Sequence, residues 1–278
     1  MTTLPKCWVS TALTFDVSEA ASLRSPAVLE ELAIRVAEAA AGLIRRNHGQ
    51  ALVVGVKSSS TDAVTQTDID AEGLIRDLLI QATPEADFYG EEGGLSGSRS
   101  RLQWIIDPLD GTINFLYALP VFAVSVAAAF DGEVVAGAVV DVLRQETFSA
   151  HKGGGSRGAG VGLSASSCAD LRQGLIATGF SYNPEIRRIQ GEIVHRVLPS
   201  ARDIRCFGSA ALQLCWVGAG RLDGYYERDT KLWDYAAGAL VASEAGATVE
   251  LPCPENDSTT LAAAAAIFEP LQLLIRPS

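Results

Sequence analysis

The segment WIIDPLDGTINF, residues 104–115, combines residue types that can do chemistry: Asp107 and Asp110 lie three residues apart where an apolar run ends. Burying two carboxylates together is costly unless a counter-charge is present. A bound divalent cation removes that cost, and ligands that are all oxygen favour Mg²⁺ or Mn²⁺ over Zn²⁺. Taken alone, the pattern also fits a capped turn whose aspartates are solvated.

Other carboxylates occur at similar places. Glu91 lies in a Gly-flanked turn, and Asp68 and Asp234 each stand at the head of a predicted helix. Each has a simpler interpretation by itself, as a solvated turn or a helix N-cap. Together they suit a site for two metals, which can activate a water and stabilise the leaving oxygen of a phosphoryl group. Gly111 allows close backbone approach, and Thr112 stands at a predicted helix start, where a phosphate is favoured.

The elements that must position these residues follow from periodicity and from turn residues. Apolar spacing predicts helices over residues 26–46 and 68–82. A strand is predicted at 52–57, followed by a loop at 58–66. A further strand at 102–107 is expected to stop at Asp107-Pro108, because proline cannot continue a hydrogen-bonded ladder.

The later part of the chain changes its pattern. Two β-prone runs around Asp131-Gly132 predict a hairpin. Beyond residue 160 strands alternate with helices, which indicates an α/β unit. The predicted strands cover 175–180, 203–207, 223–227 and 247–251, and the predicted helices cover 184–198, 209–220 and 233–246. An alanine run at 262–266 is expected at the edge of a strand or helix.

The fold class is therefore α/β, with an α+β N-terminal part and an α/β C-terminal part. We expect three stretches. Residues 1–25 form a poorly ordered N-terminal arm, residues 26–160 an α+β metal-binding part, and residues 161–278 an α/β part that completes the active site.

The composition of the chain limits which partners it is expected to bind and in which cellular compartment it is expected. Lys and Arg total 22 against 33 Asp and Glu, a formal charge of −11. Such a chain repels nucleic acid and anionic membranes, so neither is expected as a direct partner. The five cysteines fit no zinc template. Cys206 and Cys215 are predicted to be buried, reduced thiols. With no signal peptide or membrane span in the sequence, we expect a cytoplasmic protein.

The motifs together resemble a known family. LVVGVKSSSTDAVTQTD, GEE, WIIDPLDGTINF, GSAALQLC, DGYYE and WDYAAGALVASEAG occur in the order and spacing of the inositol monophosphatase family, over about residues 28–250. The resemblance implies a layered αβαβα sandwich of the sugar-phosphatase type and a homodimer. It also implies Mg²⁺ dependence, with Mn²⁺ as a possible substitute and Li⁺ as an inhibitor.

The resemblance also implies metal ligands. Glu91, Asp107 and the backbone carbonyl of Leu109 would hold the first metal. Asp107, Asp110 and Asp234 would hold the second.

Catalytic roles follow from the same resemblance. Asp68 would pair with Thr112 to orient and deprotonate the attacking water, and Glu91 is counted with them as catalytic. The backbone of Gly111 and Thr112 would hold the phosphate. Lys57, together with Asp68, marks the neighbourhood of a possible third metal.

Ala210 and Glu227 would contact the hydroxyl groups of a small-molecule phosphate monoester. A carboxylate suits a polyol and repels a second phosphate, which favours inositol 1-phosphate or a related polyol or sugar monophosphate. The expected enzyme is thus an inositol-phosphate phosphatase. Alternatives within the family are histidinol-phosphate and fructose-1,6-bisphosphate phosphatases. An alternative of another class is a protein that binds the transcription machinery.

Overall fold

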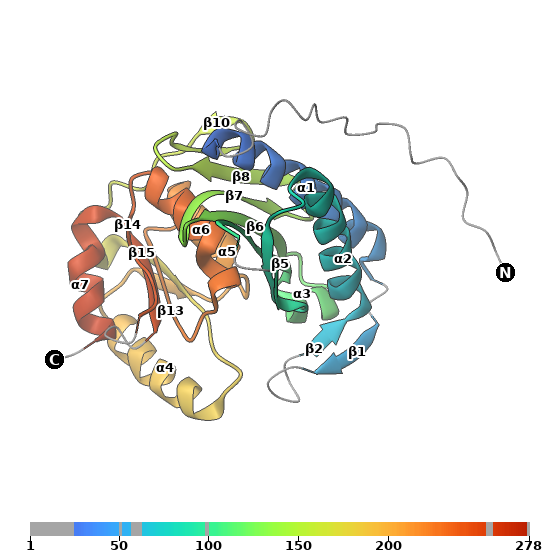
Figure 1. The fold of residues 1–278 in the computed structure, drawn as a ribbon. Coiled ribbons are helices and arrows are strands. Elements are labelled where there is room, and N and C mark those ends of the chain that lie inside the picture. The colour runs from blue at the N-terminus through green and yellow to red at the C-terminus, as the bar shows by residue number, and fades with distance from the viewer. Residues whose placement is uncertain (1–24, 50–51, 57–62, 98–99, 254–257, 277–278) are drawn as a thin grey trace.

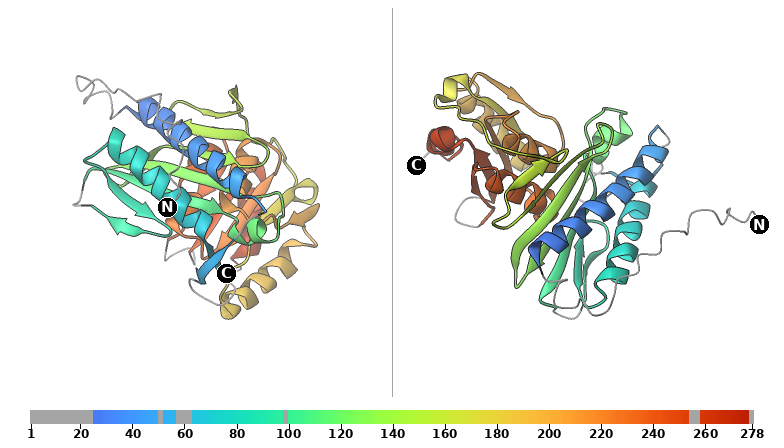
Figure 2. Two further views of the ribbon diagram at one scale, coloured as in Figure 1. Left: turned by 90° about the vertical axis from the view of Figure 1, so that its right-hand side faces the viewer. Right: turned by 90° about the horizontal axis from the view of Figure 1, so that it is seen from above.

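The computed structural model describes residues 25–49, 52–56, 63–97, 100–253 and 258–276. The predicted N-terminal arm, apart from Ser25, and the predicted third-metal residue Lys57 lie outside these ranges. Helices and sheets alternate in layers (Figures 1 and 2). The described part of the chain contains no helix with the length and apolar character that crossing a membrane requires.

Helices α1 (Pro26–Asn47) and α2 (Gln66–Ala82) form the first layer. Both predicted helices are confirmed, and Pro26 occupies the first turn of α1, where its missing N–H costs nothing. Helix α2 begins two residues earlier than predicted because Thr65 caps it: its hydroxyl accepts a hydrogen bond from the backbone N of Asp68 at 3.3 Å.

The second layer is an eight-stranded sheet in the order β10-β9-β8-β7-β6-β5-β3-β4. Its strands are β3 (Asp87–Gly90), β4 (Gly94–Ser96), β5 (Leu102–Asp110), β6 (Ala123–Phe130), β7 (Glu133–Asp141), β8 (Glu146–His151), β9 (Ser156–Gly158) and β10 (Val161–Gly162). Only the β3–β5 pair is parallel among these described strands. The predicted hairpin is confirmed as β6–β7, with positive φ at Asp131 and Gly132, as a tight two-residue turn requires.

Strand β5 corrects one prediction, because it continues through Pro108 to Asp110. Asp107 pairs with Ser125 and Asp110 with Ala123, so β5 has one residue more than β6 between these pairs. A bulge of this kind takes Pro108 out of the ladder, where its missing N–H does no harm. It also matters for chemistry. Residues three apart in a regular strand face opposite sides, whereas the extra residue puts Asp107 and Asp110 on the same side.

The remaining layers complete the predicted αβαβα sandwich. Helices α5 (Ala210–Gly218) and α6 (Leu232–Glu244) lie between the two large sheets, and α4 (Pro184–Val197) and α7 (Ala265–Ile275) cover the far side (Figures 1 and 2). The second large sheet has the order β12-β11-β13-β15-β14. Its strands are β11 (Leu175–Thr178), β12 (Asp203–Arg205), β13 (Gly224–Arg228), β14 (Thr248–Glu250) and β15 (Thr259–Ala263).

Three smaller features complete the comparison with the predicted elements. The alanine run ends β15 and begins α7, a helix that was not predicted. The predicted strand near residue 52 is confirmed as β1 (Val53–Val56). Part of the loop predicted after it is instead β2 (Ala63–Thr65), which pairs antiparallel with β1. The division of the chain near residue 160 stays a prediction.

Candidate active site

Two of the predicted carboxylates lie side by side where the parallel pairing of β3 with β5 ends. Strand β3 pairs with β5 as far as Gly90 and Ile106, so Glu91 follows β3 beside Asp107. The backbone N of Glu91 donates to the carbonyl of Ile106 at 3.1 Å. Asp107 is 2% exposed and accepts a hydrogen bond from the backbone N of Leu109 at 3.1 Å.

Asp110 joins β5 to the start of α5. Its Oδ2 accepts from the hydroxyl of Ser209 at 2.6 Å and from the backbone N of Ala211 at 2.8 Å, and its Oδ1 from the backbone N of Ala210 at 3.3 Å. Burial nevertheless raises the pKa of Asp110 to about 6, even though these hydrogen bonds favour the ionised form. The predicted substrate residue Ala210 therefore lies directly beside a predicted metal ligand.

Ser209 was missed by the sequence reasoning. It caps α5 by accepting a hydrogen bond from the backbone N of Leu212 at 3.3 Å, and the same hydroxyl donates to Asp110. A serine just before an apolar helical run is a recognisable N-cap signal. The sequence does not show, however, that the Ser209 hydroxyl donates to Asp110, about a hundred residues away.

Asp234 lies in the first turn of α6, where its Oδ2 accepts from the backbone N of Lys231 at 2.6 Å. Burial raises its pKa well above the usual value, and the charges of Glu91, Asp110 and Glu227 raise it further. The carboxylate that follows β3 and those of β5, β13 and α6 are thus near enough to repel one another.

Asp68 and Thr112 meet as predicted. Asp68 is fully buried, and its Oδ1 lies 3.0 Å from the Thr112 hydroxyl. The same hydroxyl lies 3.0 Å from the carbonyl oxygen of Leu109. A threonine hydroxyl has a single proton, so it serves only one of these two acceptors at a time. Whenever it donates to Asp68, the Leu109 carbonyl is released for another partner.

Gly111 and the short helix α3 (Thr112–Leu116) close this side of the site. Gly111 has a φ of 97°, and a Cβ there would lie 3.0 Å from the carbonyl oxygens of both Gly208 and Val121, so only glycine fits. Asn114, a second residue that was missed, donates to the carbonyls of Val121 at 2.7 Å and Phe207 at 2.6 Å. The residue 207–209 turn is thereby held against the start of α3.

Glu227 stands in β13, and burial raises its pKa to about 7, with the charges of Asp110 and Asp229 adding to the shift. The hydroxyl of Tyr225 donates to its Oε2 at 2.9 Å. Cys215 is buried as predicted, but the prediction for Cys206 is wrong. Cys206 comes directly after β12, at the edge of its sheet, and is exposed.

These carboxylates can be compared with what a metal requires. Among the residues that the structure describes, no three His, Cys, Asp or Glu side chains form a group that could hold a metal ion as they stand. Their donor chemistry nevertheless fits a hard cation, since all the side-chain donors are oxygens. Burial raises the pKa values of Asp110 and Asp234, and for Asp234 the charges of Glu91, Asp110 and Glu227 add to the shift.

Glu72 is a third residue that was missed, and it holds the turn that carries Glu91. It is 3% exposed, and its carboxylate accepts from the backbone N of Glu92 at 2.8 Å and of Gly93 at 2.9 Å. Arg76 neutralises it, with Nε 2.7 Å from Oε1. Helix α2 therefore supports the Glu91 turn through a partly buried ion pair.

We expect Glu72→Gln to lower the free energy of unfolding by about 3 kcal/mol, because it leaves Arg76 without its counter-charge. Because Glu91 is an expected metal ligand, the variant should also bind Mg²⁺ about tenfold more weakly, the usual effect of losing a residue that orients a metal ligand. Chemical denaturation and Mg²⁺ titration measure the two effects. Glu192→Gln, in the exposed Arg188–Glu192 pair, is the matched control and should change stability by less than about 0.5 kcal/mol. An unchanged Mg²⁺ requirement in Glu72→Gln would show that the Glu91 turn does not need this support.

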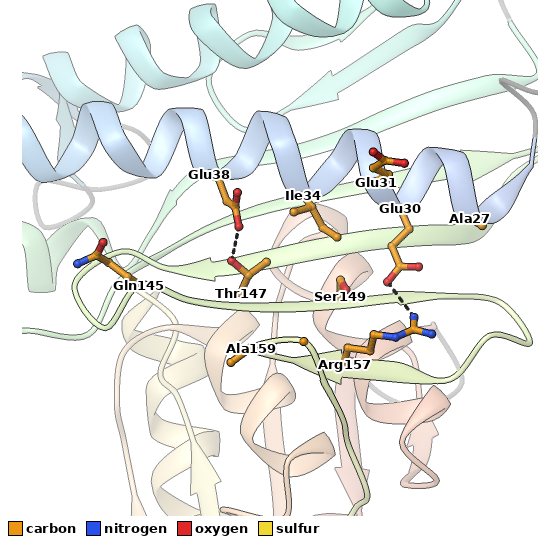
Figure 3. A pocket seen from close by; sticks show the side chains of 11 residues that line it. Ala27, Glu30, Glu31, Ile34, Glu38, Gln145, Thr147, Ser149, Arg157 and Ala159 are labelled. Carbon is orange, nitrogen blue, oxygen red and sulfur yellow. Dashed lines mark hydrogen bonds and ion pairs between the residues drawn. The ribbon is translucent and has the colours of Figure 1, made fainter. Parts of the chain in front are cut away.

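A separate hollow of about 460 Å³ lies between α1 and strands β8 and β9 (Figure 3). Two of its acidic residues have partners within the protein: Glu30 contacts His151 and Arg157, and Glu38 accepts from Thr147 at 2.8 Å. None of the predicted site residues lines this hollow. It is therefore distinct from the carboxylate site.

The model of the inositol monophosphatase family matches residues 25–272. The inositol-1-monophosphatase SuhB of Mycobacterium tuberculosis is 44% identical over 90% of this chain and 90% of its own. The Nus factor SuhB of Escherichia coli is 39% identical over 78% of this chain and 83% of its own.

The fold agrees with solved structures. The structure of Mycobacterium tuberculosis SuhB superposes with a TM-score of 0.80 at 39% identity, covering 91% of this chain and 97% of that one. The extragenic suppressor protein SuhB of Bartonella henselae superposes with a TM-score of 0.84 at 31% identity, covering 90% and 99%. The predicted layered fold is confirmed.

Proposed function

The chain belongs to the inositol monophosphatase family, and we propose that it is a Mg²⁺-dependent phosphatase of inositol 1-phosphate or a related polyol or sugar monophosphate. The observation that carries the proposal is the meeting of carboxylates from separate elements: Glu91 lies beside Asp107, and burial together with the charges of Glu91, Asp110 and Glu227 raises the pKa of Asp234. Buried like charges that raise one another's pKa values mark a functional site, and a divalent cation would relieve their repulsion.

The residues that would hold the cations are those that the family resemblance implies. Glu91, Asp107 and the Leu109 carbonyl would bind one metal, and Asp107, Asp110 and Asp234 the second. Mg²⁺, with Mn²⁺ as a substitute, would supply charge stabilisation and a water of lowered pKa, and Li⁺ would inhibit.

The protein's own groups would orient the reactants. Asp68 accepts the Thr112 proton, which turns a lone pair of the Thr112 oxygen outward, toward the attacking water. Through this contact Asp68 would help to remove the water's proton. The backbone N–H groups of Gly111 and Thr112, at the start of α3, would bind phosphate oxygens. Lys57 and a third metal stay part of the proposal.

Glu227 and Ala210 would select the alcohol part of the substrate. Glu227 would accept hydrogen bonds from sugar or cyclitol hydroxyls, and its ionised form would repel a second phosphate. We therefore favour a monophosphate of a polyol over fructose 1,6-bisphosphate. Histidinol phosphate is the competing substrate, because its cationic amine is compatible with an acidic residue such as Glu227.

Phosphate release from inositol 1-phosphate, histidinol phosphate, fructose 1,6-bisphosphate and 3′-phosphoadenosine 5′-phosphate, each with Mg²⁺, tests the proposal. We expect kcat/KM for inositol 1-phosphate to exceed the others by at least about tenfold, because the hydrogen-bonding groups of a site reject ligands that leave them unpaired. No Mg²⁺-dependent release from any compound would contradict the assignment as a phosphatase. A preference for another compound would contradict the choice of substrate.

A role in transcription is the second candidate, and it rests on the likeness to the Escherichia coli protein named Nus factor SuhB. Such a role needs a binding surface and no turnover. Binding of RNA polymerase by the Asp110→Asn variant would support it, and loss of binding together with loss of activity would argue against a separate role.

We also propose a homodimer in the cytoplasm. Tyr117 and Leu119, 76% and 52% exposed, follow α3 and offer apolar surface for a second copy. The thiols of Cys168, Cys206 and Cys215 are free, as a reducing compartment would leave them.

A further inference from the structure

Tyr225 and Glu227 occupy the same face of β13, because side chains alternate along a strand. The Tyr225 ring is fully buried in the core between the two large sheets. From there its hydroxyl reaches outward to Oε2 of Glu227 at 2.9 Å. A buried aromatic ring thus fixes the hydroxyl that holds the Glu227 carboxylate.

Gly179 supports the same carboxylate from the side. It follows the last residue of β11, and Thr178 pairs with Tyr226, so Gly179 lies beside Glu227. A Cβ on Gly179 would lie 2.0 Å from Oε2 and 2.4 Å from Oε1 of Glu227. The carboxylate of Glu227 therefore packs directly against the Cα of Gly179, and any residue with a Cβ at position 179 would displace it.

The backbone around this contact is held by Gln190 of α4, which is 3% exposed. Its amide nitrogen donates to the carbonyl of Arg228 at 3.1 Å, and its amide oxygen accepts from the backbone N of Ser181 at 3.0 Å. One side chain therefore links the segments that follow Gly179 and Glu227. Several independent contacts therefore fix the position of Glu227, as expected of a group that must meet a ligand in one orientation.

We propose that Tyr225 is a positioning residue for substrate selection: by holding Oε2 of Glu227, its hydroxyl leaves Oε1 aimed at a hydroxyl group of a polyol phosphate. The inference rests on the proposed function and deepens it. Tyr225 acts only through Glu227, since its ring is buried and its hydroxyl is occupied by that carboxylate.

The consequence is a split between binding and turnover. A carboxylate ordered before binding pays less conformational entropy when the substrate arrives, so its loss appears in KM. The phosphate is held elsewhere, at the start of α3, so kcat is independent of Tyr225. A phosphate ester without polyol hydroxyls does not use Glu227 and is indifferent to Tyr225.

The test compares Tyr225→Phe with the wild type on inositol 1-phosphate and on p-nitrophenyl phosphate, both with saturating Mg²⁺. We expect KM for inositol 1-phosphate to rise about five- to tenfold, within what a hydrogen bond to a charged group contributes. Its kcat should change by less than about twofold, and both constants for p-nitrophenyl phosphate should stay unchanged. Tyr226→Phe is the matched control, because it removes the same atom from the opposite face of the strand, where Tyr226 packs in the outer core. It should leave both substrates unaffected.

Four results would overturn the inference. The first is an equal change in KM for both substrates in Tyr225→Phe, and the second is a lower kcat for both; each indicates a merely structural role. The third is a further rise in KM when Tyr225→Phe is added to Glu227→Gln, where we expect a change below about twofold. The fourth is a Tyr225→Phe variant whose kinetic constants equal those of an active wild type, and this result overturns the inference but leaves the proposed function standing. A wild type that releases no phosphate from either compound overturns the proposed function as well.

Discussion

Asp110→Asn is expected to reduce Mg²⁺-dependent phosphate release by more than about 100-fold, beyond the factor of about 10 to 100 for residues that only support a metal ligand. The change removes one negative charge from a group of carboxylates that repel one another. That charge is what would attract a cation, and a neutral amide oxygen is a weaker ligand for Mg²⁺. The chemistry at the phosphate therefore loses its electrostatic stabilisation, usually the largest contribution to catalysis.

The fold should survive the substitution. An asparagine oxygen in the place of Oδ2 still accepts from Ser209 and from the backbone N of Ala211. Its amide group then faces the backbone N of Ala210, whose contact with Oδ1 is long at 3.3 Å. Burial raises the pKa of Asp110 to about 6, so the metal-free fold loses stability as the pH rises from the ordinary carboxyl pKa to about 6, and the full cost is present above that pH. The metal-free variant should be at least as stable as the wild type at pH 7.

Two measurements check this expectation: phosphate release, and the shift of the melting temperature on adding Mg²⁺, which reports binding without turnover. The shift should be clear in the wild type and much smaller in Asp110→Asn. Asp141→Asn is the matched control, since Asp141 is fully buried in the same sheet but paired with Arg144 at 3.0 Å. It should lose stability and keep its Mg²⁺ response. Retention of more than about a tenth of the activity by Asp110→Asn would contradict a role for this carboxylate in holding a metal.

Apolar periodicity and turn residues predicted most of the individual helices and strands, and the family resemblance implied their layered arrangement. The prediction was wrong where the tertiary context overrides a local rule. Pro108 was expected to end β5, but a bulge lets the strand continue and turns Asp107 and Asp110 to one side. Cys206 was expected inside because its neighbours are apolar, yet it follows an edge strand and is exposed.

The residues that act by chemistry of their own were easier to predict than those that hold them in place. A carboxylate at a strand end is conspicuous in a sequence, whereas its supporting partner can be any polar residue far along the chain. Glu72 looks like an ordinary helix residue, and only the structure shows it bonded to the turn beside Glu91. Asn114 and Ser209 join segments about a hundred residues apart. Hydrogen bonds between residues so far apart in the sequence produce no local pattern from which they could be predicted.

Thr112→Val is expected to lower kcat about 100-fold or more, the range attributed to a positioned proton acceptor, while leaving the fold intact. Valine matches threonine in shape and lacks only the hydroxyl that lies 3.0 Å from both Asp68 and the Leu109 carbonyl. Thr112→Ser keeps that hydroxyl and is the matched control, with a kcat within about tenfold of the wild type. Steady-state kinetics on inositol 1-phosphate measure both variants.

Asp68→Asn separates catalysis from helix capping. Asp68 also accepts from the backbone N of Thr65 at 3.0 Å, so its substitution should cost about 1 kcal/mol of stability through the cap of α2. If Asp68 acts only through the Thr112 hydroxyl, the double variant Asp68→Asn/Thr112→Val should be no slower than the more impaired single variant, since residues that work as one unit are not additive. Fully additive losses in kcat would mean that the two side chains act independently, and the proton relay through Thr112 would have to be abandoned. Near-equal losses in all three variants would instead place the two side chains in one unit, joined by the single proton that Thr112 shares between Asp68 and Leu109.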